Sequence, residues 1–177
     1  GSKATLQYRW VPYARISPQL KRAMIAAEDA KFAAHGGFDW DGIEKALEKN
    51  RKKGRVVAGG STITQQLAKN LFLSPNKSYW RKAEEAVVTV VLEAMLPKQR
   101  IFELYLNVIE WGSGVFGAEA AAQRYFGVAA AQLSAEQAAR LAAMTPSPRV
   151  FERRPDSSYL DGRVATILAR MPSAIVP

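Results

Sequence analysis

The chain has 177 residues, of which 48% are hydrophobic and 23% charged, and this composition excludes an intrinsically disordered protein. It has no cysteine, which excludes disulfide bonds and thiolate metal sites. Lys and Arg number 25 against 16 Asp and Glu, giving a formal charge of +9. This excess favours a polyanionic partner, namely nucleic acid, an anionic membrane surface or a phosphorylated substrate, although a basic surface without a special partner gives the same count.

No stretch of about 18 consecutive apolar residues occurs, so the sequence predicts no transmembrane helix. The opening Gly1-Ser2 resembles a scar left by an expression vector. We therefore expect that a signal or anchor upstream has been removed.

The predicted elements are helical along the whole chain. Ser17 caps a first helix that begins at Pro18 and should end at Gly36-Gly37. The other predicted helices, each bounded by a cap, a glycine or a proline, cover 39–49, 63–71, 79–96, 98–107, 118–125, 134–143 and 156–171. A glycine-rich turn at 54–60 contains the one candidate extended segment, 55–57, and 112–117 is predicted to be a glycine loop. The pattern predicts one compact all-α domain, with two lobes hinged near 54–60.

The end of the first predicted helix carries two adjacent acids and the only histidine of the chain. At 100° per residue, Glu28, Phe32 and His35 share one face, and Asp29 turns aside. The apolar residues before Glu28 should desolvate its carboxylate and raise its pKa toward the range of a general acid or base. A solvated surface acid is the alternative for Glu28, and a helix C-cap is the preferred interpretation of His35.

The segment GGSTITQQLAKN, 59–70, gathers polar groups at the start of a helix. Gln65 and Lys69 share a face, and Gln66 and Asn70 share the neighbouring face. Such groups suit sugar hydroxyls and phosphate oxygens, and the helix N-terminus favours negative charge. An ordinary polar helix face remains the alternative.

The segment KSYWRKAEEAVVTVVLEAM, 77–95, places an acid among cations. Glu85 begins an apolar face and should lie at the rim of buried surface, while Lys77, Arg81 and Lys82 form a cationic cluster suited to a pyrophosphate. An exposed ion pair between Arg81 and Glu85 is the alternative. Glu93 stands in an apolar run and requires a partner if it is buried.

These features together indicate glycosidic-bond chemistry. Two carboxylates on different helices, with cations and amides between them, are typical of it, and no P-loop or dinucleotide-binding glycine motif occurs. The cationic cluster indicates a sugar donor with a phosphate leaving group.

Five stretches of the sequence resemble, in order, the five motifs of the peptidoglycan glycosyltransferases. They span 28–151 and are EDAKFAAHGGF, GGSTITQQLAKNLFL, RKAEEAVVTVVLE, RIFELYLNVIEWGSGVFGAEAAAQRYFG and LSAEQAARLAAMTPSPRVF. The family includes stand-alone transglycosylases and the polymerising domain of class A penicillin-binding proteins. Because the chain ends one helix after the fifth motif, we expect a monofunctional transglycosylase formed by 1–177.

The resemblance implies a lysozyme-like, mostly helical fold with a large head lobe and a smaller, membrane-facing jaw lobe. Members of the family polymerise lipid II, a disaccharide-pentapeptide joined through pyrophosphate to an undecaprenyl tail. The family's catalytic base corresponds to Glu28, which takes the proton of the acceptor's 4-hydroxyl as this oxygen attacks the anomeric carbon of the growing chain. The product is β-1,4-linked, with inversion. The second family glutamate corresponds to Glu85, with a proposed role at the leaving pyrophosphate.

The resemblance also implies a set of substrate-binding residues, with Lys69 on phosphate. The set is Asp29, Phe32, Lys45, Ser61, Thr62, Gln65, Gln66, Lys69, Lys77 and Arg81. Lys45 and Lys77 stand where relatives often have arginine, so the charge is retained and the bidentate fork is lost.

Further expectations concern cofactors, partners and location. A divalent cation, Mg²⁺ or Mn²⁺, would bridge the donor pyrophosphate; no cluster with metal-ligand spacing is present to hold one alone, so the metal ligands stay unknown. The expected partners are lipid II, the growing glycan chain, the membrane surface and other cell-wall synthesis and division proteins, without nucleic acid. The expected location is the outer, periplasmic face of the bacterial inner membrane, with a single N-terminal anchor. Residues 71–73 and Tyr79-Trp80 are candidates for contact with this membrane, and core packing is their alternative.

Two other functions were compatible with parts of the pattern. A glycan-cleaving lysozyme-like hydrolase or lytic transglycosylase would also use a buried acid, but would not need the glutamines and cations suited to pyrophosphate. A basic helical module that binds membrane or nucleic acid would need neither glutamate.

Overall fold

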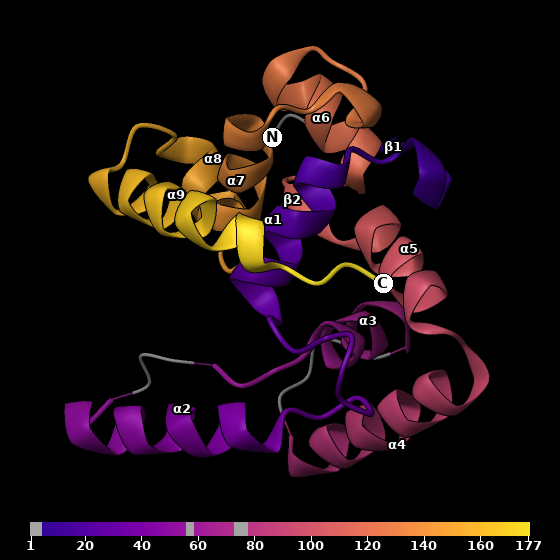
Figure 1. Cartoon of the computed structure of the whole chain (residues 1–177), viewed down its shortest axis with the longest axis vertical. Coiled ribbons are helices and arrows are strands. Elements are labelled where there is room, and N and C mark those ends of the chain that lie inside the picture. Colours follow the sequence, from indigo (N-terminus) through magenta and orange to yellow (C-terminus); the bar gives the residue numbers. More distant parts are fainter. Residues whose placement is uncertain (1–4, 56–58, 73–77) are drawn as a thin grey trace.

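The structure, a computed structural model, describes residues 5–55, 59–72 and 78–177 and is mostly helical (Figure 1). Its helices are α1 (Pro18–Glu28), α2 (Trp40–Lys53), α3 (Ile63–Phe72), α4 (Tyr79–Met95), α5 (Lys98–Val108), α6 (Ala118–Phe126), α7 (Ala135–Met144), α8 (Pro148–Arg153) and α9 (Ser158–Arg170). Short 3₁₀ turns cover Tyr13–Arg15, Ala130–Gln132 and Met171–Ser173, and three short strands are β1 (Gln7–Tyr8), β2 (Glu110–Gly112) and β3 (Val115–Phe116).

The predicted helix caps are confirmed in the structure. The side chains of Ser17, Asp39, Ser78 and Ser157 each accept a hydrogen bond from a backbone N–H in the first turn of the helix that follows. Ser134 forms the predicted capping box at the start of α7. Each cap satisfies a backbone donor that the helix leaves without a partner, and capping residues therefore mark where helices begin. For this reason the helix starts agree closely with the sequence pattern.

The first helix is shorter than predicted. It ends at Glu28, where Asp29 leaves the helical conformation with φ −161° and ψ 76°, and the chain continues in irregular turns as far as α2. The predicted common face of Glu28, Phe32 and His35 therefore does not form. The helix ends here because the carboxylate of Asp29 accepts a hydrogen bond from the backbone of Ile63, at the start of α3.

The expectation that nothing outside 55–57 is extended was wrong. β3 lies in the segment predicted as a glycine loop and pairs in parallel with β1 and in antiparallel fashion with β2, which ends at Gly112. Gly117, which follows β3, has φ +84°, and a Cβ there would lie 2.6 Å from the carbonyl oxygen of Asn107. Two- and three-residue strands are too short to produce an alternating pattern.

Helix α8 is a second difference from the prediction, because the prolines of this stretch predicted irregular structure. Residues 56–58, in the predicted hinge and extended segment, lie outside the described residues.

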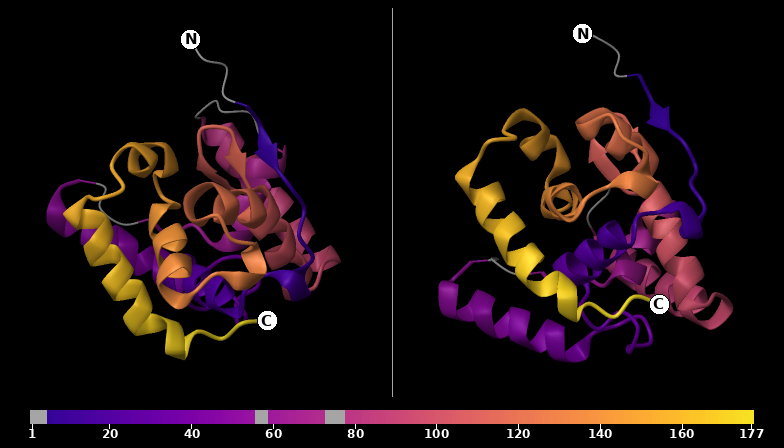
Figure 2. Two further views of the ribbon diagram at one scale, coloured as in Figure 1. Left: turned by 90° about the horizontal axis from the view of Figure 1, so that it is seen from above. Right: turned by 45° about the horizontal axis from the view of Figure 1, so that its top comes forward.

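The core is centred on α1 and α7. The α1 residues Leu20, Ala23, Met24 and Ile25 are fully buried, and α7 packs against both α1 and α9. The contact face of α7 consists mainly of alanines, whose small side chains allow the helix axes to approach closely. Figure 2 shows α9 lying across this layer and α2 on the far side of the molecule from α6.

Helices α2 and α4 lie together at one end of the molecule, and α6 to α9 lie at the other (Figure 1). Between the two ends, α3 packs against both α4 and α5. The arrangement places the end of α1, the start of α3 and the start of α4 around a common space, and all three segments carry predicted site residues.

Asn107 joins the N-terminal segment to α5 and provides a test of this architecture. Its fully buried side chain accepts a hydrogen bond from the N–H of Val11 at 2.8 Å and donates one to the carbonyl of Val11 at 2.9 Å. Asn107→Ala would leave both buried backbone groups without partners, so we expect the free energy of unfolding to fall by about 3 kcal/mol in urea titrations. Gln99→Ala, at an exposed position of α5, is the control. Equal stability of the two variants would contradict this account.

Candidate active site

A cleft of about 930 Å³ opens between the two ends of the molecule. Its lining comes from the end of α1, the region from Gly59 through α3, the start of α4, and α5 with the turn that precedes α8. The lining residues are Glu28, Gly59, Ser61, Gln65, Gln66, Lys69, Asn70, Ser78, Tyr79, Arg81, Lys82, Glu85, Tyr105, Ile109, Glu110, Thr145, Pro146 and Pro148. The structure thus brings both predicted catalytic glutamates to one cleft.

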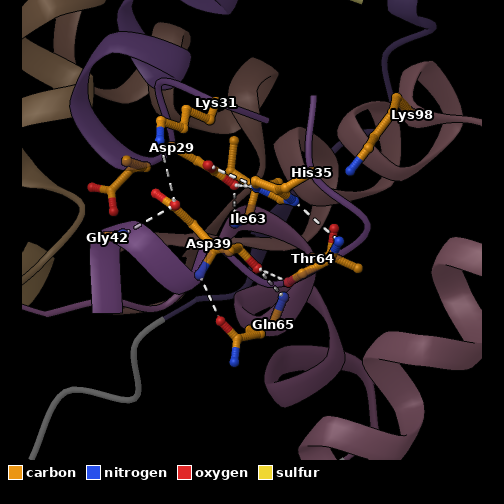
Figure 3. A network of polar contacts seen from close by, with 12 residues as sticks. Asp29, Lys31, His35, Asp39, Gly42, Ile63, Thr64, Gln65 and Lys98 are labelled. Atoms are coloured by element: carbon orange, nitrogen blue, oxygen red, sulfur yellow. Dashed lines mark hydrogen bonds and ion pairs between the residues drawn. The ribbon is translucent and has the colours of Figure 1, made fainter. Parts of the chain in front are cut away.

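The carboxylate of Asp29 connects α1 to α3 (Figure 3). It is buried and accepts the backbone N–H of Ile63, the first residue of α3, at 3.0 Å. His35 Nε2 lies 2.9 and 2.8 Å from its two oxygens. A negative charge at the N-terminus of a helix is favourable, and here it also sets the position of α3 relative to the end of α1.

The hydrogen bonds of His35 define its tautomer. The backbone N–H of Gly37 donates to Nδ1 at 3.0 Å, so the proton of the neutral ring is on Nε2 and points at Asp29. His35 lies seven residues beyond the end of α1, and its interpretation as a C-cap of that helix was therefore wrong. Its role in the structure is to hold the carboxylate of Asp29.

Thr62 and Gln65 form the capping box of α3. The Thr62 N–H donates to Gln65 Oε1 at 2.9 Å, and the Gln65 N–H donates to Thr62 Oγ1 at 3.2 Å. The Thr62 hydroxyl also donates to the carbonyl of Gly37 at 2.6 Å. Gly37 has φ +105°, a conformation that favours glycine. Thr62 is thus buried in the connection between the turn after α1 and α3, whereas Gln65 lines the cleft.

The carboxylate of Glu28 has one hydrogen-bond donor on each oxygen. Gln66 Nε2 donates to Oε2 at 3.1 Å, and the hydroxyl of Thr145 donates to Oε1. Each oxygen keeps lone pairs that a group in the cleft can use. Glu28 is the last residue of α1, and α3 and the end of α7 hold its carboxylate from two sides.

Tyr105 of α5 determines which way the amide of Gln66 points. Its hydroxyl donates to Gln66 Oε1 at 3.0 Å, which leaves the NH₂ group to face Glu28. Burial, together with the nearby charges of Glu28 and Asp29, raises the pKa of Tyr105 well above its ordinary value. The phenol therefore stays protonated near neutral pH and remains a donor.

Glu85, on α4, lines the wall opposite Glu28, and its side chain is buried. Lys82, one turn before it, approaches its carboxylate to 3.3 Å. Arg81 and Lys69 also line the cleft, so this side of it carries three cations and the carboxylate of Glu85. This side of the cleft is suited to an anionic group, whereas the Glu28 side offers a carboxylate held by neutral donors.

Four of the predicted residues that the structure describes lie outside the cleft. Asp29 and Thr62 belong to the buried connection described above, and Lys45 is exposed on α2. Phe32 is fully buried, with Phe102 at 5.6 Å and the amine of Lys98 at 4.6 Å from its ring centre. Lys77 lies outside the described residues, as does residue 73 of the candidate membrane segment 71–73.

Glu93 has the partners that its apolar surroundings require. Its carboxylate accepts hydrogen bonds from Thr64 at 2.7 Å and from Lys98 at 2.6 Å. It therefore belongs to the packing of α3, α4 and α5, and it does not line the cleft.

Tyr105 and Thr145 are site residues that the sequence pattern does not reveal. Both lie in segments that were matched to motifs, but neither belongs to a charge cluster or to a helix face shared with Glu28. The only available signal was a polar residue adjoining an otherwise apolar run. Their contribution depends on contacts across 39 and 117 residues of sequence.

The described residues do not form a complete cation site by themselves. Among them, no three His, Asp or Glu side chains gather closely enough to hold a metal ion. On the α3–α4 wall, Glu85 offers a single carboxylate with cationic neighbours. A bound cation would therefore need oxygen atoms from a ligand, which suits an ion shared with a phosphorylated substrate.

Comparisons with known proteins agree on one family. The family model described as Transglycosylase matches residues 2–172. The biosynthetic peptidoglycan transglycosylase of Dechloromonas aromatica (strain RCB) is 66% identical over 175 residues, which cover 99% of this chain and 76% of that protein. The proteins of the same name from Herminiimonas arsenicoxydans and Nitrosospira multiformis are 62% and 60% identical, and the matches cover 99% and 100% of this chain and 76% and 77% of those proteins.

The connection through Asp29 leads to a prediction about stability. Asp29→Asn replaces a charged acceptor by a neutral amide whose NH₂ group can face a donor, so we expect a loss of about 2 kcal/mol in the free energy of unfolding. The backbone amide of Ile63 should exchange with deuterium faster than it does in the wild type, and by a larger factor than the amides in the middle of α3. Asp156→Asn, at an exposed position, is the control and should change neither measurement. An unchanged Ile63 exchange rate in Asp29→Asn would contradict the role assigned to this carboxylate.

Proposed function

Because the chain belongs to the Transglycosylase family, we propose that Glu28 is the general base of its cleft and that Glu85 assists the leaving group. The protein is a peptidoglycan glycosyltransferase, which polymerises glycan strands from lipid II in cell-wall synthesis. The observation that supports the two assignments is that both glutamates line one cleft, on opposite walls and with different surroundings.

In the proposed reaction, the 4-hydroxyl oxygen of the acceptor sugar forms a bond to the anomeric carbon of the growing chain. The bond from this carbon to the pyrophosphate oxygen breaks, and its electron pair leaves with the undecaprenyl pyrophosphate. The proton of the hydroxyl passes to Glu28. A single displacement of this kind inverts the anomeric configuration and gives a β-1,4 linkage.

The hydrogen bonds of Glu28 support its assignment as the base. Gln66 and Thr145 keep its carboxylate directed into the cleft, so little reorientation is needed when a hydroxyl approaches. Both donors are neutral, and proton acceptance by Glu28 does not require breaking an ion pair. Tyr105 contributes as a positioning residue, because it holds the amide of Gln66 in the orientation that Glu28 needs.

The cations of the opposite wall support the placement of the donor pyrophosphate there. Lys69 and Arg81 are proposed to contact its oxygens, and Lys82 adds positive charge beside Glu85. Negative charge accumulates on the leaving pyrophosphate in the transition state, and cations already in place stabilise it. Ser61 and Gln65 line the same region and are proposed to bind sugar hydroxyls. For Lys45 and Lys77, substrate binding stays a prediction.

Three predicted binding residues, Asp29, Thr62 and Phe32, are buried, and we propose that they position the residues that line the cleft. Asp29 and Thr62 position the start of α3, which carries Gln65 and Gln66. Phe32 packs beneath them in the core and contacts His35 edge to face. Direct substrate contact is therefore assigned to residues of the cleft lining.

A divalent cation at the donor site is also a proposal. Mg²⁺ or Mn²⁺ would be held by Glu85 together with pyrophosphate oxygens, and when bound it would neutralise charge on the leaving group. Lys69, Arg81 and Lys82 supply positive charge at the same wall whether or not an ion is bound.

We propose that the α4 end of the molecule faces the membrane. In the described part of the chain, no helix has the length and apolar character needed to cross a bilayer. The outer face of α4, however, exposes Trp80, Val87 and Val91, and Tyr79 beside them is 98% exposed. Such a face fits the interface of the inner membrane on its periplasmic side, where lipid II is reached, with an anchor outside this chain. Other cell-wall synthesis and division proteins are further proposed partners.

The assignment of the two glutamates predicts different kinetic defects. Glu28→Gln removes the proton acceptor while keeping the shape of the side chain, so we expect kcat for lipid II polymerisation to fall by about 10³-fold with nearly unchanged binding of a substrate analogue. Glu85→Gln should reduce kcat by a smaller factor, and adding EDTA to the wild type should have a comparable effect if a cation is shared with pyrophosphate.

Glu136→Gln, at an exposed position of α7, is the matched control and should retain full activity. Wild-type activity in Glu28→Gln would refute its role as base. Release of fragments from finished peptidoglycan without polymer formation from lipid II would instead favour a glycan-cleaving enzyme.

The membrane proposal predicts that Val87→Ser with Val91→Ser reduces binding to vesicles containing anionic lipid about fivefold or more, because apolar area that enters the interface is lost. Binding is measured by co-sedimentation, and activity on lipid II in the same vesicles should fall in parallel. The control combines Val150→Ser with Ile175→Ser, two similarly exposed apolar positions away from α4. Equal vesicle binding by the two double variants would count against the orientation proposed.

A further inference from the structure

A second cavity, of about 310 Å³, lies in the groove between α1 and α9. We define this α1–α9 groove by Ala26 and Ala27 of α1 and by Ser158, Arg163, Thr166 and Arg170 of α9. Ala27 immediately precedes Glu28, so the groove begins next to the proposed base. It is nevertheless separate from the cleft, since none of its defining residues lines the cleft.

The groove carries positive charge that nothing in the described chain neutralises. Within residues 5–55, 59–72 and 78–177, neither Arg163 nor Arg170 has an ion-pair partner, and no lining residue is acidic. Asp161, the acid closest to them in sequence, is bonded to Arg140 at 2.9 Å. The two guanidinium groups are therefore available to a ligand.

Arg163 also has an unmade hydrogen bond. Its Nε–H is buried and has no acceptor in the described part of the chain. A buried donor without a partner is destabilising, and a carboxylate or phosphate oxygen that reaches this guanidinium would offset that cost through a charge-assisted bond. The planar guanidinium favours an oxyanion that accepts two parallel hydrogen bonds.

We infer that the α1–α9 groove binds carboxylates of the peptide carried by the substrate. This inference rests on the proposed function, in which the disaccharide that carries the peptide reacts beside Glu28. The position of the groove indicates which part of the substrate supplies the oxyanion. Helix α9 lies on one side of the end of α1, and α4 lies on the other (Figure 1). Helix α4 carries the cations assigned to pyrophosphate and the face assigned to the membrane. The groove is therefore placed for the part of the substrate that is neither lipid nor pyrophosphate.

The spacing of the two arginines fits an extended peptide. Seven residues separate them on α9, which places them on one face about 10 Å apart along the axis. An extended peptide advances about 3.3 Å per residue, so carboxylates three residues apart span the same distance. A pentapeptide is long enough to reach both guanidinium groups, and it ends in a carboxylate.

The kinetic test compares lipid II that has free peptide carboxylates with lipid II in which these groups are amidated. The wild type should have a KM about tenfold lower for the free-carboxylate form. Arg163→Gln with Arg170→Gln should abolish this preference by raising the KM for that form, with unchanged kcat and KM on the amidated form. The control double variant, Arg15→Gln with Arg124→Gln, removes the same charge at exposed positions and should keep the preference. A wild type without preference, or a groove variant that keeps it, would overturn the inference.

A binding measurement separates this inference from the proposed function. The Nε–H resonance of Arg163 is followed by NMR while the free pentapeptide, its fully amidated form or inorganic phosphate is added. Only the peptide with free carboxylates should shift the resonance in the millimolar range. A response to phosphate equal to that of the peptide would refute the peptide assignment and indicate a phosphate site. If the peptide shifts the resonance while the wild type fails to polymerise lipid II, the groove assignment stands and the proposed catalytic roles fail.

Discussion

The cleft depends on one buried charge, the carboxylate of Asp29. This carboxylate accepts hydrogen bonds from the first N–H of α3 and from the ring of His35. Asp29 itself directly follows the last residue of α1. One side chain thus sets how far Glu28, at the end of α1, stands from Gln66, one turn into α3. A buried carboxylate is costly unless its oxygens are satisfied, and here a helix N-terminus and a histidine satisfy them. The need to make these bonds explains why α1 stops at Glu28.

The orientation of the Gln66 amide likewise depends on a single hydrogen bond, the one from Tyr105. A glutamine amide alone can direct either its NH₂ group or its carbonyl at a carboxylate, and the carbonyl would repel it. The hydroxyl of Tyr105 removes this ambiguity, because it donates to the carbonyl oxygen and leaves the NH₂ group for Glu28. The raised pKa of Tyr105 keeps that hydroxyl a donor. The negative charge of Glu28 contributes to this rise, so the proposed base helps to preserve the chain of hydrogen bonds that positions it.

Local signals in the sequence predicted most of the fold and both glutamates of the cleft. Caps such as Ser78 and the box at Thr62 act within one helical turn, and they place the helix starts well. The end of α1 was misplaced because Asp29 bonds to Ile63, 34 residues away, and such a partner cannot be read from helical periodicity. The small sheet was missed because its strands have only two or three residues, too few to show alternation. Motif resemblance assigned Glu28 and Glu85, and the positioning role of Tyr105 required the three-dimensional contacts.

The two walls of the cleft are electrostatically unlike, and this difference suits a displacement between sugars. In the proposed reaction, proton transfer to Glu28 reduces negative charge at one wall while negative charge grows on the pyrophosphate at the other. Neutral donors around Glu28 leave its carboxylate able to accept a proton, and the cations near Glu85 are proposed to stabilise the departing group. Exchanging these environments would pair the base with a cation and oppose proton uptake. The proposed reaction therefore has a direction in the cleft, with the acceptor beside α1 and the donor pyrophosphate beside α4, and the uncompensated arginines of α9 lie on the α1 side of this axis.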